Sequence, residues 1–96
     1  NGKIACTELK VQLYAQWPDF VFGERYKLRS LGEVENYIKA NKHLPETPTA
    51  REIEKNGISV GEMQANMMQK IEELTLYIIE QQKQIEALKA EMEKLK

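Results

Sequence analysis

The sequence contains few of the residues that usually carry chemistry. Its 96 residues include a single cysteine, Cys6, and a single histidine, His43. One cysteine excludes a disulfide bond within the chain, and these two residues alone make neither a zinc-ligand set nor a Cys–His pair close in sequence. The five glycines are dispersed, so the chain lacks a glycine-rich phosphate-binding loop. We therefore expect no catalytic residue, no metal and no cofactor.

Charge of one sign and long apolar runs are also missing. The net charge is −1, and the basic residues are scattered along the chain, so we expect no nucleic-acid partner. No apolar run is long enough to cross a bilayer and no signal peptide is recognisable, so we expect no membrane insertion. The chain begins at Asn1 rather than at a methionine, which suggests a piece of a longer protein.

The N-terminal part predicts one or two short strands. Residues 3–14 alternate with period two, which is typical of a strand, with these side chains on one face: Ala5, Thr7, Leu9, Val11 and Leu13. Pro18 cannot donate to a ladder and would end this strand, and residues 20–22 predict a second strand or a buried loop. The fold class that follows is α+β, with a small head over residues 1–57 and a long helix over residues 58–96.

Three capping boxes predict the starts of three helices. In each box a serine or threonine is followed by glutamate three positions later, at Ser30, Thr49 and Ser59. The first helix should end near Asn41, and the second at residues 56–57 with a left-handed cap at the glycine. Between these two helices, residues 43–48 contain two prolines and predict an extended connector.

The head should pack around the proximal part of the long helix, over residues 63–79, because apolar side chains there exceed what a narrow seam needs. The side chains that we expect to make this contact are aromatic or lie in the proline-rich connector: Trp17, Phe20, Phe22, Leu44, Pro45 and Tyr77. Trp17, Phe20 and Phe22 together with Tyr26 could instead form a ligand-binding aromatic patch, which is less common than the core of a small domain.

The long helix carries a heptad repeat, which is a specific signal for a coiled coil. With Ile71 at position a, the a and d positions over four heptads are Met67, Ile71, Leu74, Ile78, Gln81, Ile85, Leu88, Met92 and Leu95. Only Gln81 in this seam is polar. The pattern predicts self-association of the distal half through these nine residues; the alternative is a helix that packs back on its own domain.

Several segments resemble a known family. NGKI at the start, WPDFVF, YKLRSLGEVENYI, NKHLPETPTAREI, NGISVGEM and QKIEELTLYIIEQ follow one another in an order similar to C-terminal tail-fibre domains of Bacteroidetes and their phages. Those domains are related in design to the intramolecular chaperone domain of phage endosialidases and tail spikes. The resemblance implies a module that joins three chains and registers an upstream trimeric fibre, whose last strand would be the N-terminal strand here.

In some members of that family the module cuts itself off at a Ser-Asp junction. The matching place here is Pro18-Asp19, and proline provides no nucleophile, so we do not expect autoproteolysis. A self-cleaving chaperone remains the rival function, and a zipper-type nucleic-acid binder lacks the required basic region. We therefore predict a homotrimeric parallel coiled coil, with a dimer as the second choice, at the end of a virion tail fibre or a cell-surface adhesin.

Overall fold

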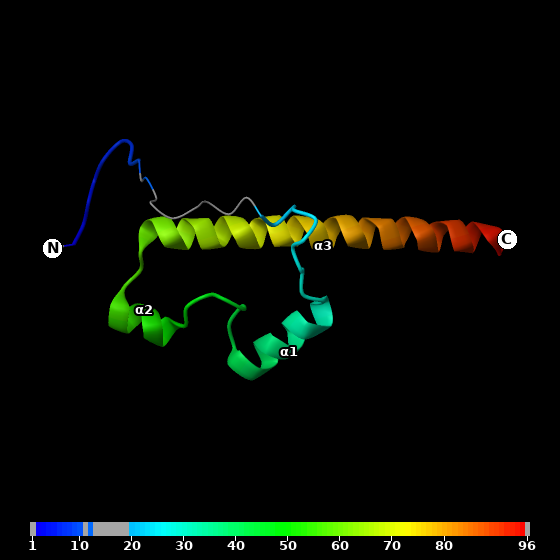
Figure 1. Ribbon diagram of the computed structural model, residues 1–96, viewed down its shortest axis with the longest axis horizontal. Coiled ribbons are helices and arrows are strands. Elements are labelled where there is room, and N and C mark those ends of the chain that lie inside the picture. Colours follow the sequence, from blue (N-terminus) through cyan, green and yellow to red (C-terminus); the bar gives the residue numbers. More distant parts are fainter. Residues whose placement is uncertain (1, 11, 13–19, 96) are drawn as a thin grey trace.

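The computed structural model describes residues 2–10, 12 and 20–95, and it contains three helices (Figure 1). They are α1 (Leu31–Asn41), α2 (Ala50–Asn56) and α3 (Val60–Lys94). The 35 residues of α3 make a rod about 52 Å long, at about 1.5 Å per residue. Both short helices lie on one side of this rod, and residues 20–30 cross it before entering α1.

The described residues form three helices and no strand, so the predicted α+β class is wrong; residues 11, 13 and 14 of the predicted strand lie outside the described residues. Residues 3–10 and 12, which we expected in the first strand, are exposed and unpaired with any strand among the described residues. Residues 20–22 enter a turn, in which Gly23 N–H donates to the Phe20 carbonyl at 3.0 Å. Alternation of side chains cannot by itself form a strand, because the ladder needs a second strand to receive its hydrogen bonds.

The helices begin where the capping sequences predict. Ser30 Oγ accepts a hydrogen bond from Glu33 N–H at 3.1 Å. Thr49 forms a complete capping box, since its Oγ1 accepts from Glu52 N–H at 3.1 Å and Thr49 N–H donates to the Glu52 carboxylate at 3.2 Å. Ser59 precedes α3 as expected, but its side chain makes no capping bond, so the third box is not formed.

The helix ends agree with the sequence in position but not in every conformation. Helix α1 ends at Asn41, and Lys42 follows in the left-handed region with φ 62° and ψ 24°. Helix α2 ends at Asn56, where Gly57 N–H donates to the Ile53 carbonyl at 2.8 Å. Gly57 has φ 75° but ψ −173°, which is not the left-handed cap that we expected. Glycine is still needed here because a positive φ combined with an extended ψ is essentially confined to glycine.

The connector contains a turn and is not extended throughout. Thr47 N–H donates to the Leu44 carbonyl at 3.3 Å, and Thr47 Oγ1 donates to the same oxygen at 2.6 Å. Pro45 occupies the second position of the turn, and Glu46 the third, with φ 64°. Proline fixes φ at a value that suits both this turn and an extended segment. The prolines alone therefore did not distinguish the turn from the extended connector that we predicted.

The single chain has almost no core. Among the described residues only Val21, Pro45 and Gly61 are buried, and no Cα atom of one helix lies within 8 Å of a Cα atom of another. The accessible surface is 8902 Å², against about 5,700 Å² for a compact monomer of this mass. The radius of gyration is 18.8 Å, where about 13 Å is typical of a compact chain of this length. The single chain therefore leaves exposed much of the apolar surface that a compact monomer would bury.

Candidate functional site

A polar cluster of five residues attaches the head to α3: Tyr26, Arg29, Glu46, Lys70 and Glu73. Arg29 Nη1 lies 3.0 Å from Glu46 Oε1, and Lys70 Nζ lies 3.1 Å from the same oxygen. Lys70 also reaches Glu73 Oε1 at 3.2 Å, and Tyr26 donates its hydroxyl hydrogen to the Glu73 carboxylate. The cluster thus joins the segment before α1, the connector turn and one face of α3.

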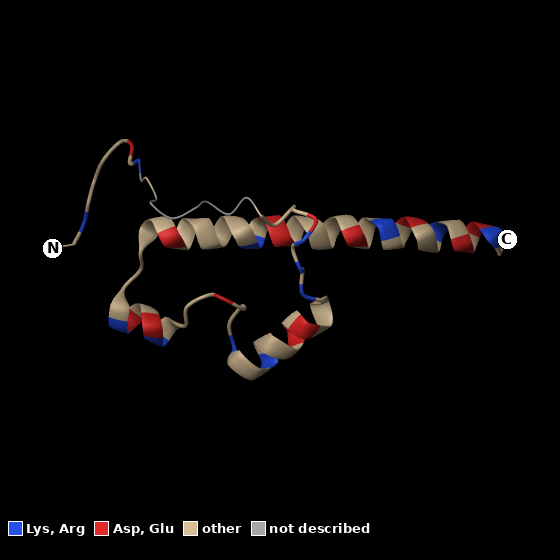
Figure 2. Ribbon diagram, viewed as in Figure 1, with Lys and Arg blue, Asp and Glu red and all other residues tan. Residues whose placement is uncertain are grey.

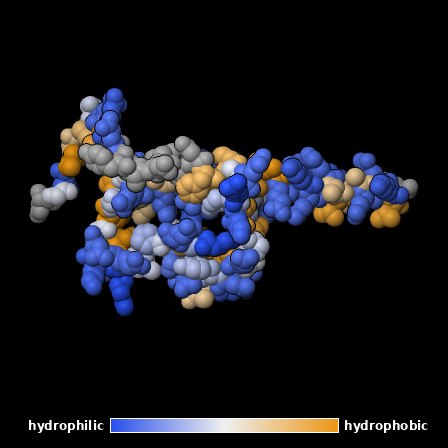
Figure 3. Space-filling model, in the orientation of Figure 1, coloured by the Kyte–Doolittle hydropathy of each residue, from blue (hydrophilic) through white to orange (hydrophobic). Residues whose placement is uncertain are grey.

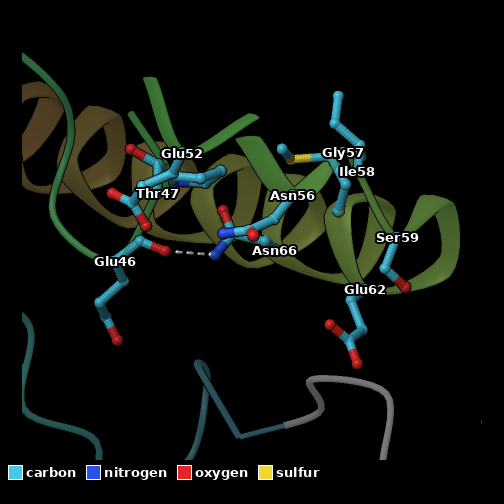
Figure 4. Close-up of a pocket in the computed structure, with 11 residues that line it drawn as sticks. Glu46, Thr47, Glu52, Asn56, Gly57, Ile58, Ser59, Glu62 and Asn66 are labelled. Carbon is cyan, nitrogen blue, oxygen red and sulfur yellow. Dashed lines mark hydrogen bonds between the residues drawn. The ribbon is translucent and has the colours of Figure 1, made fainter. Parts of the chain in front are cut away.

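Three further hydrogen bonds extend this attachment along α3. Asn66 Nδ2 donates to the Glu46 carbonyl at 2.9 Å (Figure 4). Gln69 Nε2 donates to the Tyr26 hydroxyl at 3.3 Å. The hydroxyl of Tyr77 donates to the Arg29 carbonyl at 2.6 Å. Among the described residues no hydrogen bond joins the head to α3 beyond Tyr77, so the attachment covers only the proximal half of the helix.

The cluster shifts the pKa values of its members in directions that follow from their contacts. The hydrogen bond from Arg29 lowers the pKa of Glu46, and Lys70 adds to this, while partial desolvation opposes it. Desolvation, followed by the hydrogen bond to Glu73, raises the pKa of Tyr26. Desolvation also raises the pKa of Tyr77. At neutral pH Glu46 is therefore a carboxylate between two cations, and both tyrosines are neutral donors.

The apolar seam of α3 is uncovered in the single chain. The exposed fractions of its aliphatic side chains run from about half to nearly complete: Met67 50%, Ile71 54%, Leu74 57%, Ile78 64%, Ile85 46%, Leu88 60%, Met92 64% and Leu95 87%. Gln81, the polar member, is also exposed. In Figure 3, apolar atoms gather along one edge of the half of α3 that projects past the head. The seam is therefore an apolar stripe facing solvent, interrupted only at Gln81.

The projecting half of α3 has no cover from the described part of its own chain. All residues from 78 to 95 are exposed. Figure 2 shows basic and acidic residues alternating along this half of the rod, which is typical of the solvated faces of a coiled coil. A helix with one bare apolar stripe and charged flanks is suited to bind another helix of the same kind.

The residues predicted to pack the head have different environments. Pro45 is buried, Tyr77 is half-buried, and Leu44 is 45% exposed. Phe20 lies against Tyr26, with ring centroids 5.6 Å apart, yet it is 51% exposed, and Phe22 is 58% exposed. Trp17 lies outside the described residues, as do Pro18 and Asp19 of the possible cleavage junction.

Sequence reasoning did not identify the residues that hold the head in place. Val21, between the two phenylalanines, is the most buried side chain, at 2% exposed. Arg29 and Glu46 were not singled out, and Tyr26 was considered only as part of an aromatic cluster, because their partners on α3 lie 20 or more positions away in sequence. No local signal in the sequence indicated the turn at Pro45, because a turn with positive φ at its third position favours glycine or asparagine and that residue is Glu46 here.

A cavity of about 510 Å³ lies between the connector, α2 and the start of α3 (Figure 4). Its lining includes three carboxylates, two hydroxyls and the half-buried Asn66, whose Oδ1 has no hydrogen-bond partner. Glu52 already serves the Thr49 capping box, and Glu46 belongs to the polar cluster. The remaining groups lie on an open surface and define no reaction.

Other chemistry is not assembled in the described residues. No group of three or more His, Cys, Asp or Glu side chains there is arranged to hold a metal ion. Cys6 is exposed, and His43 packs edge-on against Tyr37, with its Nδ1 2.8 Å from the Leu44 carbonyl oxygen. Across the described ranges no helix combines the length and apolar character needed to span a bilayer.

Comparisons with protein-family models, with curated protein sequences and with solved structures find no match to this chain.

Proposed function

We propose that this chain is a self-association module, in which the α3 helices of several copies form a parallel coiled coil through the seam from Met67 to Leu95. The observation that carries the proposal is the exposed apolar stripe, with every aliphatic seam residue at least 46% exposed. The head is attached at the proximal half of α3 and leaves this stripe free.

The energetics favour self-association over a solvated helix. Burying one aliphatic side chain of this size contributes about 1.5–3 kcal/mol. Eight such side chains per copy lie on the seam. Association costs conformational and translational entropy, and part of the free energy gained by burying these side chains offsets that cost. A second copy of the same helix presents an apolar stripe with the same spacing, so the coil needs no other partner.

We propose three chains rather than two. Isoleucine at a with leucine at d favours two-stranded coils, which supports the dimer as the alternative. Two features favour three chains. First, the apolar surface of proximal α3 is wider than a two-position seam, because Met63, Met68 and Leu76 lie outside the a and d positions and are half-buried. Second, Gln81 at position d can form a polar layer around a threefold axis.

The resemblance to tail-fibre C-terminal domains suggests what the trimer is for. Under this proposal the module aligns three copies of an upstream fibre in a virion tail or a cell-surface adhesin, and assists their folding. The partners are other copies of the chain and the upstream domains of the same polypeptide.

The molar mass in solution, measured by light scattering, tests the proposal. We expect three times the chain mass for the wild type. The variant Ile85→Asp/Leu88→Asp places charges in the seam and should lower the mass to that of one chain. The matched control, Ala87→Asp/Ala90→Asp, adds the same charge at exposed positions c and f and should keep the wild-type mass. A monomeric wild type, or seam and control variants of equal mass, would contradict the proposed function.

A further inference from the structure

A small apolar hollow separates α1 and the connector from α3. Its volume is about 120 Å³, and its apolar lining consists of Leu31, Val34, Leu44, Pro45, Leu74 and Tyr77. Figure 3 shows an opening between the head and the rod on the viewed face. Leu31 and Ile38 of α1 are 46% and 39% exposed, and Leu44 of the connector is 45% exposed, so the described part of the chain does not fully cover the apolar face of α1.

The polar contacts of the head hold this hollow open. Tyr77 binds the Arg29 carbonyl just before α1, and Lys70 binds Glu46 in the connector turn. These bonds fix the two ends of the head loop on α3, while the Cα atoms of α1 stay more than 8 Å from those of α3. The hollow is therefore a feature of how the head is attached, and collapse of α1 onto α3 would break these bonds.

The heptad register places the hollow at the edge of the proposed coil. Leu74, in its wall, is a seam residue at position d, and Lys70 and Tyr77 occupy the flanking position g. In a parallel coiled coil the g positions of one helix face the e positions of its neighbour. This step rests on the proposed function, and it means that the hollow borders the next copy of α3.

Ile79 lies outside the seam, on the side of α3 that would face the hollow of an adjacent copy. Ile79 lies at position b, four residues after Thr75 at position e, so the two share one side of the helix. Position b of a coiled coil is normally polar, yet Ile79 is apolar and 46% exposed. An exposed isoleucine beside the e position is thus available to a surface contributed by another copy.

We infer that Ile79 of one copy enters the hollow between α1 and α3 of the adjacent copy. An apolar cavity of about 150 Å³ holds a benzene molecule with its six carbon atoms. The hollow, at about 120 Å³, therefore has room for the four side-chain carbon atoms of an isoleucine. The head of each copy would then cover the outer face of its neighbour, closing the ring of helices around residues 70–79. The occupant is a second copy of this chain, because the seam that it borders is already matched to one.

Disulfide trapping between separately prepared chains tests this contact. In a Cys6→Ser background, a Leu31→Cys chain and an Ile79→Cys chain are unfolded, mixed and refolded together. After mild oxidation, intact mass spectrometry identifies the disulfide that joins one chain of each kind. In the matched control, a Glu80→Cys chain replaces the Ile79→Cys chain; Glu80 is the next residue and lies at position c. We expect the mixed disulfide to be at least several-fold more abundant with Ile79→Cys than with Glu80→Cys. Glu80 lines a cleft with Leu31 of its own chain.

Light scattering on the same mixtures separates the two proposals. An oligomeric mass without the mixed Leu31–Ile79 disulfide, both here and with Leu44→Cys in place of Leu31→Cys, would overturn the inference and leave the coiled coil intact. Equal trapping by the Ile79→Cys and Glu80→Cys chains would overturn it too. A mass of one chain would overturn the proposed function, and the inference with it.

Discussion

Glu46 makes two polar contacts with α3, as many as Tyr26, and it is also paired with Arg29 in the head. Its carboxylate lies between Arg29 and Lys70, and its carbonyl accepts from Asn66. It holds a backbone conformation, φ 64°, that costs a non-glycine residue about 1–3 kcal/mol. These contacts offset that cost and keep the connector turn seated on α3.

Replacing Glu46 with glutamine should lower the melting temperature at neutral pH. Two partly exposed ion pairs are lost, each worth about 0.2–1 kcal/mol, so we expect a fall of several °C. Because folding lowers the pKa of Glu46, its contribution is present above the unfolded value of 4.5 and is lost as the pH falls through the folded value. Thermal unfolding at fixed chain concentration should therefore show wild type and variant converging below pH 4.5.

The variant Glu35→Gln is the control for this experiment. It removes only the exposed pair with Lys39, whose charged atoms are 3.9 Å apart. It should change the melting temperature much less, and a difference between wild type and Glu46→Gln that stays constant down to pH 2 would rule out the charge of Glu46 as the cause.

Gln81 is the second residue whose replacement should have a clear effect. At position d it interrupts the apolar seam, so Gln81→Ile should raise the melting temperature of the oligomer and weaken its discrimination between two and three chains. Lys83→Ile, at the outermost position f, adds the same apolar group outside the seam and should not stabilise. Sedimentation equilibrium measures the chain number. A Gln81→Ile variant no more stable than wild type would contradict this account of the seam.

At the scale of the elements, the three helix starts differ in how they are capped. Ser30 and Thr49 both accept a hydrogen bond from the N–H group three residues later, whereas Ser59 makes no side-chain cap bond. An identical local sequence pattern therefore gives different local structures. Helix α3 has 35 residues, while α2 has only seven and depends more on its ends.

Alanine substitutions should reproduce this difference. Ser30→Ala and Thr49→Ala each remove a formed cap and should destabilise the protein by about 0.5–2 kcal/mol. Ser59→Ala removes no cap bond and should have a smaller effect. Chemical denaturation of the three variants, with oligomeric state held constant, gives the comparison. A loss of stability at Ser59 equal to that at Thr49 would show that the third cap forms in solution.

At the scale of the whole molecule, the chain has two regimes along α3. Apolar side chains of the proximal part, among them Met63, Met68, Leu76 and Tyr77, are half-buried. From residue 78 every described residue of the helix is exposed, although Glu80, Gln81 and Gln84 line a cleft with the start of α1. Under the proposed function, other copies cover the distal part.

Removing residues 1–57 should expose the proximal apolar side chains. The remaining peptide, residues 58–96, would present a surface wider than a coiled-coil seam, so we expect it to aggregate. Light scattering and dye binding compare it with the full chain at equal concentration. A monodisperse, soluble coiled coil from the peptide alone would show that the head is not needed to cover α3.

The sequence by itself determined the local features: where each helix begins and ends, and which side chains of α3 share one stripe. Caps, prolines and the heptad repeat act within a few residues, so their effects follow from adjacent positions. The strand at residues 3–14 failed for the opposite reason. A strand needs a partner elsewhere in space, and the described residues supply none.

Only the tertiary structure decided how the head is attached. Tyr26 and Glu73, or Arg29 and Tyr77, are more than 40 residues apart in sequence, and no local pattern pairs them. The turn at Pro45 and the positive φ of Glu46 place one carboxylate between Arg29 and Lys70. Such a contact depends on the paths of three segments at once, because a hydrogen bond forms only when its atoms come within about 3 Å.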